Sequence, residues 1–397
     1  MKRNGAGLAS ICILLTMVLV MISSTTSLYF GEEDAVKNRC PNDVNITMTF
    51  DTIEGISDTN LNMLRDCIRQ YSGEDVNLKG VRACEIPGLI TQEGITIDTS
   101  SHVNFSASTY NNVGYLSVLS IDDYNTMMGT NETLADDECF VYCDRLNYQW
   151  DTFTMEYGAT YKVKEQLDDF QVDGDTAAMI MPTVFLVVDD IYVFSEPVKD
   201  MKNSNGAPMM MYDWRCGFNV DTADIENETS ENLKEMFRNM YIENNDAFYS
   251  YSVQSRDAMR ASFYDVYGSL FFLGIMLSIV FLLAAVLIIY YKQISEGYED
   301  YSRFEIMQKV GMTKKDIRKS INSQMLTVFF LPLILAGIHL TFAFPFISKI
   351  LMLFAMDNII LSVIVNLICF VVFGLFYVLI YKITSNSYYS IVSGRKE

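Results

Sequence analysis

Histidine is almost absent from this chain, which has two among 397 residues. A catalytic triad or a metal site built on histidines therefore has very little to use. The patterns Gly-x4-Gly-Lys-Ser/Thr, Gly-x-Ser-x-Gly and His-Glu-x-x-His are also missing from the sequence. Their absence argues against the phosphate-binding loop of ATPases, the nucleophile turn of hydrolases and the zinc-protease helix. We expect no catalytic residue, no bound cofactor and no metal site on this chain.

Basic residues are scarce between positions 30 and 265. This segment holds 42 acidic and 16 basic residues, whereas the rest of the chain holds 7 acidic and 13 basic residues. Nucleic-acid binding needs a positive surface, so this charge argues against it. An apolar content of 50% excludes intrinsic disorder. An acidic block flanked by apolar runs with basic ends is typical of a membrane protein with an exposed domain.

Acidic and basic residues are missing from four long runs: 4–31, 266–291, 320–348 and 358–381. Each run exceeds the roughly 20 residues that a helix needs to cross the hydrocarbon core. A central charge would cost such a helix about 2.5–3.5 kcal/mol. We therefore predict a polytopic α-helical membrane protein with four transmembrane helices and a large α+β extracellular domain inserted after the first helix.

The predicted boundaries follow from these runs. They are an N-terminal helix at 1–31, an extracellular domain with a C-terminal helical stalk at 32–265, helices at 266–291, 320–348 and 358–381, a cytoplasmic loop at 292–319 and a cytoplasmic tail at 382–397. His339 lies inside the third run, where a neutral histidine bonded to a neighbouring helix and a functional group are the two alternatives.

Basic residues also set the orientation in the membrane. They precede the first run, dominate the loop at 292–319 and recur in the tail. We expect a multi-pass protein of the cell membrane with both termini cytoplasmic and residues 32–265 outside. The first run also resembles a secretory signal, but its apolar stretch is longer than a cleavable core of about 7–15 residues. That length favours a retained helix, and residues 32–265 are exported in either case.

The exported block carries mixed local signals. Alternation at 45–50 and the β-rich run 184–188 predict strands. Helical spacing of apolar residues predicts helices at 59–71 and 230–242, the second with Ser230 as its N-cap. The segment 255–267 lacks glycine and proline, so it predicts a stalk that continues into the second membrane helix. Such a stalk suits either transmission of motion or a rigid spacer.

Cysteine usage leaves three alternatives open in the exported block. Disulfides and free thiols are both compatible with an even number of cysteines in an exported domain. A metal site is the weakest alternative, because the pair at 139 and 143 lacks the Cys-x2-Cys spacing of structural zinc sites. The six cysteines are Cys40, Cys67, Cys84, Cys139, Cys143 and Cys216. Acidic pairs such as Asp122-Asp123 form either a solvated surface or a surface that attracts cationic peptides.

The loop at 292–319 predicts two short helices. The first, at about 298–310, puts Phe304, Met307 and Val310 on one face and ends at Gly311. The second begins at Thr313, with an acidic residue three positions later in the manner of a capping box. We expect the first helix to lie along the membrane surface, with its apolar face in a groove of a cytosolic partner or on lipid.

The same loop carries a longer pattern, Arg303-Phe-Glu-Ile-Met-Gln-Lys-Val-Gly-Met-Thr-Lys-Lys-Asp-Ile317. Ser-Glu-Gly precedes it, and Phe-Phe-Leu-Pro-Leu-Ile follows in the next apolar run. Together with the order of the four runs, this pattern resembles the FtsX-like permeases of ABC transporters, of the MacB and BceB types. The resemblance implies that the loop is a coupling helix held in the cleft of a separately encoded ATPase, which binds the ATP. Residues implied in coupling are Glu296, Gly297, Arg303, Phe304, Glu305, Ile306, Gly311 and Met312.

The resemblance further implies a permease subunit that couples ATP hydrolysis to movement of the extracellular domain. Its substrates would be peptide antibiotics, resisted or sensed, or lipids of the cell envelope. BceB-type permeases carry more membrane helices in one chain. The sequence is thus either the C-terminal part of such a permease, with an N-terminal half elsewhere, or a four-helix chain that pairs with a second copy. A membrane-anchored receptor or signalling adaptor without transport is the alternative from another class.

Overall fold

The computed structural model describes residues 5–72, 76–78, 80–97, 113–144, 146, 148–168, 170, 181–243, 248–311, 313–352, 354, 356 and 358–392. The chain forms two compact units. A helical unit contains Met1–Asp34 and Ser262–Glu397, and a mixed unit contains Ala35–Ala261.

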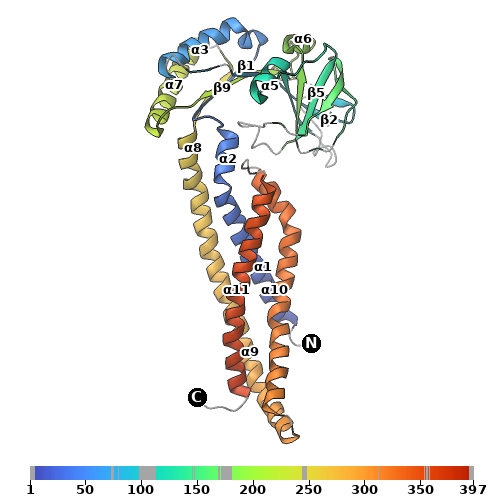
Figure 1. The fold of residues 1–397 in the computed structure, drawn as a ribbon, viewed down its shortest axis with the longest axis vertical. Helices are drawn as coiled ribbons and strands as arrows, with labels where there is room; N and C mark the ends of the chain where they lie inside the picture. The colour runs from blue at the N-terminus through green and yellow to red at the C-terminus, as the bar shows by residue number, and fades with distance from the viewer. Residues whose placement is uncertain are drawn as a thin grey trace. The chain divides into compact units, whose positions relative to one another are not determined.

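The helical unit contains four helices that are long and apolar enough to cross a membrane, counted over the described residues. They are α1 (Gly5–Phe30), α9 (Ser269–Lys309), α10 (Lys314–Met352) and α11 (Ile359–Val392), and Figure 1 shows them running side by side. Large apolar side chains such as Phe342, Ile360 and Leu375 point outward from them. Water would disfavour an apolar surface of this extent, whereas hydrocarbon does not. The helical unit therefore has the surface of a membrane protein.

Polar groups inside this unit find partners on neighbouring helices. His339 of α10 lies with its Nδ1 3.1 Å from the Thr16 hydroxyl of α1. The expected bond between this histidine and a neighbouring helix is therefore present, and in hydrocarbon such a bond satisfies both polar groups.

Residues Tyr264–Gly268 form a π-helical segment that joins α8 (Arg256–Phe263) to the start of α9. This is the end of α9 farther from α10 along the chain. Two of its tyrosines are tied to other parts of the helical unit. The Tyr264 hydroxyl donates to the Glu32 carboxylate at 3.0 Å, and the Tyr267 ring meets Phe354 edge-on at 5.0 Å. The predicted stalk is therefore helical without a break, but it is not uniformly α-helical.

The mixed unit contains ten strands among its described residues. They are β1 (Val44–Phe50), β2 (Val81–Thr91), β3 (Gly94–Thr96), β4 (Val113–Ser120), β5 (Glu138–Asp144), β6 (Thr152–Met155), β7 (Thr160–Gln166), β8 (Thr183–Val188), β9 (Met211–Phe218) and β10 (Ser250–Ser255). Helices accompany them: α2 (Glu32–Arg39), a 3₁₀ turn (Ile53–Ile56), α3 (Asp58–Ser72), α5 (Ile121–Met128), α6 (Ile191–Ser195) and α7 (Ala223–Glu243).

Strand pairing closes part of this sheet on itself. The order β2-β3-β6-β7-β5-β8-β4 returns to β2, because β2 also pairs with β4. Closure removes the exposed edges of these seven strands. β9, β1 and β10 continue from the other side of β2 as an open extension. The α+β class predicted for the exported block thus takes the form of a small closed sheet with a three-stranded arm.

Burial alternates along the strands and separates two faces. In β1 the side chains of Val44, Ile46, Met48 and Phe50 are buried, and those between them are partly exposed. They join one large core with residues of α3 and α7 such as Leu64 and Phe237. A second, smaller core lies under α5. The period-2 pattern that predicted a strand at 45–50 is therefore the pattern that places α3 and α7 on one face.

Helix α7 begins earlier than the sequence predicts. Ser230 is not its N-cap, because the helix starts at Ala223 and Ser230 is buried in its third turn. Thr222 precedes the helix, and its hydroxyl accepts from the Ile225 N–H at 3.4 Å. The helical turns before Ser230 are polar, and apolar residues do not recur in them at helical spacing. One of their acids, Glu226, is buried and accepts from the Ser255 hydroxyl, a long-range partner that local reasoning does not reveal.

All eight cysteines lie at described positions, and all are free thiols in the structure. Cys139 and Cys143 lie four residues apart on β5, which separates their Cα atoms by about 13 Å, far beyond the reach of a disulfide. Burial raises the pKa of the Cys139 and Cys216 thiols to about 12, and it also raises the pKa of Cys84. The structure therefore has the free-thiol alternative, with three thiols held protonated in the core.

These pKa shifts predict the alkylation pattern of the folded protein. A pKa about three units above that of a free thiol makes the thiolate fraction about a thousandfold smaller near neutral pH. At pH 8, iodoacetamide should modify the half-buried Cys67 and Cys143 while sparing Cys84, Cys139 and Cys216, as peptide mass spectrometry would show. Raising the pH to 9 should increase modification of the three buried thiols in proportion to hydroxide but leave it far below that of Cys67. Equal modification of all five in the folded protein would contradict the buried assignment.

Candidate functional site

The turn between α9 and α10 closes the end of the helical unit where basic residues gather in the sequence. Helix α9 ends at Lys309, and Gly311 follows with φ +106°, a conformation that disfavours residues with a side chain. The next helix starts with a capping box, in which the Asp316 N–H donates to the Thr313 hydroxyl and the Thr313 N–H donates to the Asp316 carboxylate, each at 3.3 Å. The helix stop and helix start predicted here therefore lie where the sequence puts them.

The structure corrects the prediction of a separate surface helix at about 298–310. These residues continue α9, which runs for 41 residues without a break. The only helix-weakening residue between the apolar run and the turn is Gly297, and it is helical. Its missing side chain leaves room for a ring of α11: an added Cβ would come within 3.3 Å of Tyr388. Packing against α11 at Gly297 therefore favours a continuous α9 at a position where glycine would weaken the helix.

The predicted apolar face is also wrong in one residue. Phe304 points into the helical unit, with 6% of its surface exposed, whereas Met307 and Val310 are exposed. Ile306, which lies outside the predicted face, is 62% exposed, and Val310 is 83% exposed. The exposed apolar groups at the turn are thus Ile306, Met307 and Val310, and we name them the apolar tip. Phe304 is a packing residue that holds this end of α9 in place.

A hydrogen bond between helices fixes the same end of α9. The Tyr388 hydroxyl of α11 donates to the Asp300 carboxylate at 2.9 Å, and Arg303 donates to the other carboxylate oxygen at 3.1 Å. Neither Asp300 nor Tyr388 is among the predicted site residues. They are 88 residues apart in the sequence, and nothing in the local pattern joins them.

Helix α10 is attached to α11 near the same end. The Arg318 guanidinium lies 5.2 Å from the centre of the Tyr389 ring, and the Ser385 hydroxyl lies 3.4 Å from Asn322 Oδ1. Residues 382–392, predicted as a cytoplasmic tail, belong to α11 in the structure. This last part of α11 thus braces both helices that carry the turn.

The other predicted coupling residues lie around the tip. Arg303 is exposed beyond its contact with Asp300, and Glu305 forms an exposed ion pair with Lys309 one helical turn away, at 2.9 Å. Glu296 lies one turn before Asp300 on α9. Met312 lies outside the described residues. The residues that the structure brings together are therefore Gly297 and Asp300, which meet Tyr388 of α11, and Arg303, which meets Asp300.

The side chains exposed at this end of the molecule suit the docking of a partner. Over the described residues, no group of three or more histidine, cysteine or acidic side chains could hold a metal ion. The exposed side chains combine the apolar tip with charged groups of both signs. Such a surface suits a protein partner, which can bury the apolar groups and pair the charges at its rim.

The helical unit thus has the architecture of a polytopic membrane protein whose second and third long helices meet at an exposed turn. Residues 275–394 match the family model described as the FtsX-like permease C-terminal domain. The chain is also similar to the ABC transporter permease protein YxdM of Bacillus subtilis (strain 168). The two are 24% identical over 153 residues, which are 38% of this chain and 23% of that protein.

Residues 275–394, which cover most of α9 together with α10 and α11, are thus similar to the C-terminal domain of FtsX-like permeases. The chain spans less than a quarter of the length of the curated relative that it matches. The resemblance inferred from the loop pattern is confirmed at the level of the family.

The hydroxyl of Tyr388 should contribute measurably to the stability of the helical unit. Replacing Tyr388 by Phe keeps the ring against Gly297 but removes the hydrogen bond to a carboxylate, which is worth about 1.5–3 kcal/mol. The purified variant should unfold at a lower temperature than the parent protein in the same detergent. Tyr389→Phe is the matched control, because it keeps the ring beside Arg318. Equal unfolding temperatures for the two variants would contradict the role given to the Asp300–Tyr388 bond.

Proposed function

We propose that this chain is the permease subunit of an ABC transporter complex and that its apolar tip docks into a separate ATPase chain. The observation that carries the proposal is the exposed apolar tip on a rigid helix end, within a segment that matches the FtsX-like family. ATP binds to the partner in this proposal, in keeping with the missing phosphate-binding loop.

Docking at the tip would use groups that the fold holds in place. Ile306 lies on the last turn of α9, and Val310 follows the helix directly. Gly311 then ends the helical path of the backbone. Arg303 and Glu305 flank them with opposite charges. We assign Glu296 and Gly297 to the support of this surface through α11, and Phe304 to its packing, whereas Met312 keeps the role implied by the resemblance.

Movement at the tip would pass to the exported domain along α9. This helix is 41 residues long, about 60 Å at 1.5 Å per residue, and it is continuous from the turn to the π-helical segment. A partner that moves the tip therefore acts on a long lever, with no through-bilayer path required. The cargo we propose is a peptide antibiotic or a lipid of the cell envelope, which the exported domain binds or senses.

Further partners follow from the outward-facing apolar helices. We propose that a second permease unit covers part of this surface, either another copy of the chain or an N-terminal permease half, and that membrane lipids cover the rest. A membrane-anchored receptor that uses the same tip without transport is the competing function, and dependence of activity on ATP hydrolysis separates the two.

Charging the apolar tip should detach the ATPase. In the double variant Ile306→Asp/Val310→Asp, two exposed side chains lose about 1.5–3 kcal/mol each of apolar burial at the interface. The amount of ATPase that co-purifies from native membranes in mild detergent should therefore fall more than about tenfold. Both positions are exposed, so membrane insertion should be unchanged.

Val193→Asp is the matched control for the tip variants. Val193 is as exposed as Ile306, but it lies on α6 of the exported domain. It should leave ATPase recovery at the parental level. Full recovery of the ATPase with the double tip variant, or absence of any ATPase from the parental preparation, would overturn the proposed coupling role and favour the receptor.

The proposed orientation has a separate test. The basic loop and tail should be cytoplasmic and the mixed unit outside. A phosphatase that is active only outside the cytoplasm should work when it is inserted after Gly206, in an exposed loop of the mixed unit, and should be inactive when it is fused after Glu397. The opposite activities would reverse the topology.

A further inference from the structure

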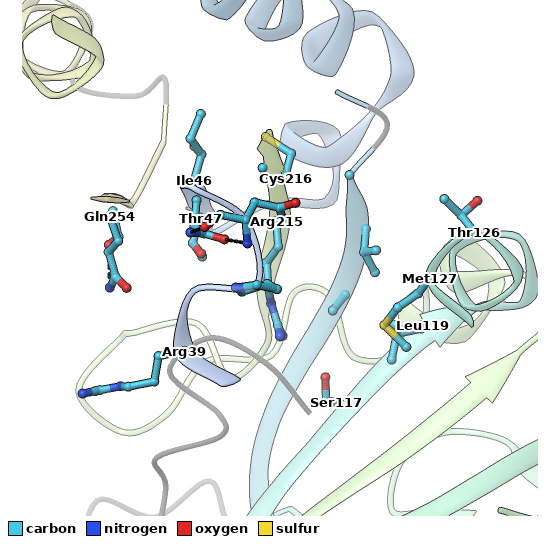
Figure 2. Close-up of a pocket in the computed structure, with 18 of the residues that line it drawn as sticks. Arg39, Ile46, Thr47, Ser117, Leu119, Thr126, Met127, Arg215, Cys216 and Gln254 are labelled. Atoms are coloured by element: carbon cyan, nitrogen blue, oxygen red, sulfur yellow. Dashed lines mark hydrogen bonds between the residues drawn. The ribbon is translucent and has the colours of Figure 1, made fainter. Parts of the chain in front are cut away.

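The mixed unit has a cavity of about 210 Å³ beside its sheet. Figure 2 shows it with Arg215, Gln254 and Met127 among the residues of its lining. The Arg215 guanidinium donates to the Glu85 carboxylate at 2.8 Å, and the Gln254 amide donates to the Ser252 hydroxyl at 3.3 Å. These two polar side chains are held within the mixed unit and do not require a ligand.

One histidine of the helical unit differs, because its ring is bonded on one side only. The Thr16 hydroxyl of α1 donates its proton to the Cys12 carbonyl at 2.8 Å. The same oxygen lies 3.1 Å from Nδ1 of His339, so there it accepts the Nδ1 proton. Nε2 of that ring makes no hydrogen bond to a described residue, and the side chain is exposed on the surface of the helical unit. In a neutral ring of this tautomer, Nε2 is an acceptor without a donor.

The exposed ring lies at the depth of the hydrocarbon core. His339 is five residues from the middle of the charge-free run 320–348, and Thr16 is within two residues of the middle of the run 4–31. At 1.5 Å per residue these distances are about 8 Å and about 3 Å, whereas the core extends about 15 Å to either side of its middle. Ionisable side chains at this depth face other helices and not lipid. The exposed side of His339 therefore requires a hydrogen-bonding group from another membrane helix.

The side chains next to His339 on α10 suit helix packing. Leu335 precedes it by four residues, and Phe342 and Phe346 follow it by three and seven, so all four share one face of the helix. The two phenylalanines are 80% and 70% exposed. Helices associate in lipid through close packing and through hydrogen bonds between them. A second helix on this face would supply both.

A second copy of the chain brings the missing group to the right depth. The two-fold axis of a membrane dimer runs along the membrane normal, so a residue near the axis meets its own counterpart. Imidazole suits that pairing, because one ring nitrogen donates and the other accepts. One His339 keeps its Nδ1 proton on Thr16 and accepts at Nε2. The His339 of the other copy donates from Nε2, and its Nδ1 accepts from the Thr16 hydroxyl beside it.

We propose that the face of α10 around His339 is the contact between two copies of this chain, joined by a hydrogen bond between the two Nε2 atoms. The inference deepens the proposed function and rests on it for the need of a second permease unit, which it names as another copy of the chain. The apolar tip takes no part in this contact. Loss of ATPase docking and loss of pairing between copies are therefore separate results.

Two copies with different tags, produced together in native membranes, test the contact. Recovery of the second tag in a mild-detergent pull-down through the first should fall about tenfold with His339→Leu in both copies, because that change removes the hydrogen bond between helices. His339→Asn should restore near-parental recovery, since its amide both donates and accepts. Thr341→Val is the matched control. Thr341 is also exposed on α10, but its hydroxyl donates to the Gly337 carbonyl of its own helix, so recovery should stay parental.

Crosslinking locates the contact. In a chain that also carries Cys12→Ala and Cys369→Ala, His339→Cys should give a disulfide-linked dimer when the membranes are treated with copper phenanthroline, because the two-fold contact brings the sulfur atoms within reach. Ile368→Cys in the same chain should not. Ile368 is 56% exposed on α11 and lies near the middle of the run 358–381.

Three results would overturn the proposal: no recovery of the second tag with the parental chain, parental recovery with His339→Leu, or a dimer through position 368 and not through 339. The unfolding temperature of each variant, measured alongside, separates loss of the contact from loss of the fold.

Discussion

Hydrocarbon offers no hydrogen bonds to a polypeptide backbone, and the helical unit follows from that constraint. Every N–H and C=O group in the membrane must be satisfied within a helix, so the chain can turn only where water or protein replaces the lipid. The turn at Gly311 follows this rule, since it comes after the charged end of α9 and before the capping box of α10. The surface exposed at the turn between α9 and α10 is therefore set by where the helices are permitted to end.

Side-chain contacts decide how firmly that surface is presented. The Tyr388 hydroxyl on Asp300 and the Tyr388 ring over Gly297 join α11 to α9, and Arg318 over Tyr389 joins α10 to α11. On α9 these contacts lie within about three helical turns of Ile306, the nearest residue of the apolar tip. Ile306 and Val310 can be fully exposed because Phe304, between them and the apolar run, packs inward. One helix thus supplies both the anchor and the contact surface.

Much of the helical unit could be predicted from the sequence, because its signals are local. Charge-free runs predict the four helices, and Gly311 with Thr313 and Asp316 predicts the turn. The separate surface helix was wrong for a tertiary reason: a glycine at 297 normally weakens a helix, but here it makes room for Tyr388. The burial of Phe304 also has a tertiary origin, since packing against the other helices decides which face of α9 is buried.

Less of the mixed unit could be predicted from the sequence. Strand alternation predicted β1, and helical spacing predicted α3, because each has one buried face. Closure of the sheet could not be predicted, since it depends on β2 pairing with β3, β4 and β9 along different parts of its length. The buried acid near the start of α7, Glu226, likewise depends on meeting Ser255. Such features arise from long-range pairing, which one sequence does not reveal.

The π-helical segment at Tyr264–Gly268 has a mechanical meaning. A π-turn holds one residue more than an α-turn in the same stretch of helix. Converting it to α-helix would rotate the preceding residues by about 100° and displace them by about 1.5 Å relative to α9. Tyr264 on Glu32 and Tyr267 on Phe354 oppose that conversion. Over its described residues, the long helix therefore contains one discrete step, which lies inside the helical unit a few residues after Ser262.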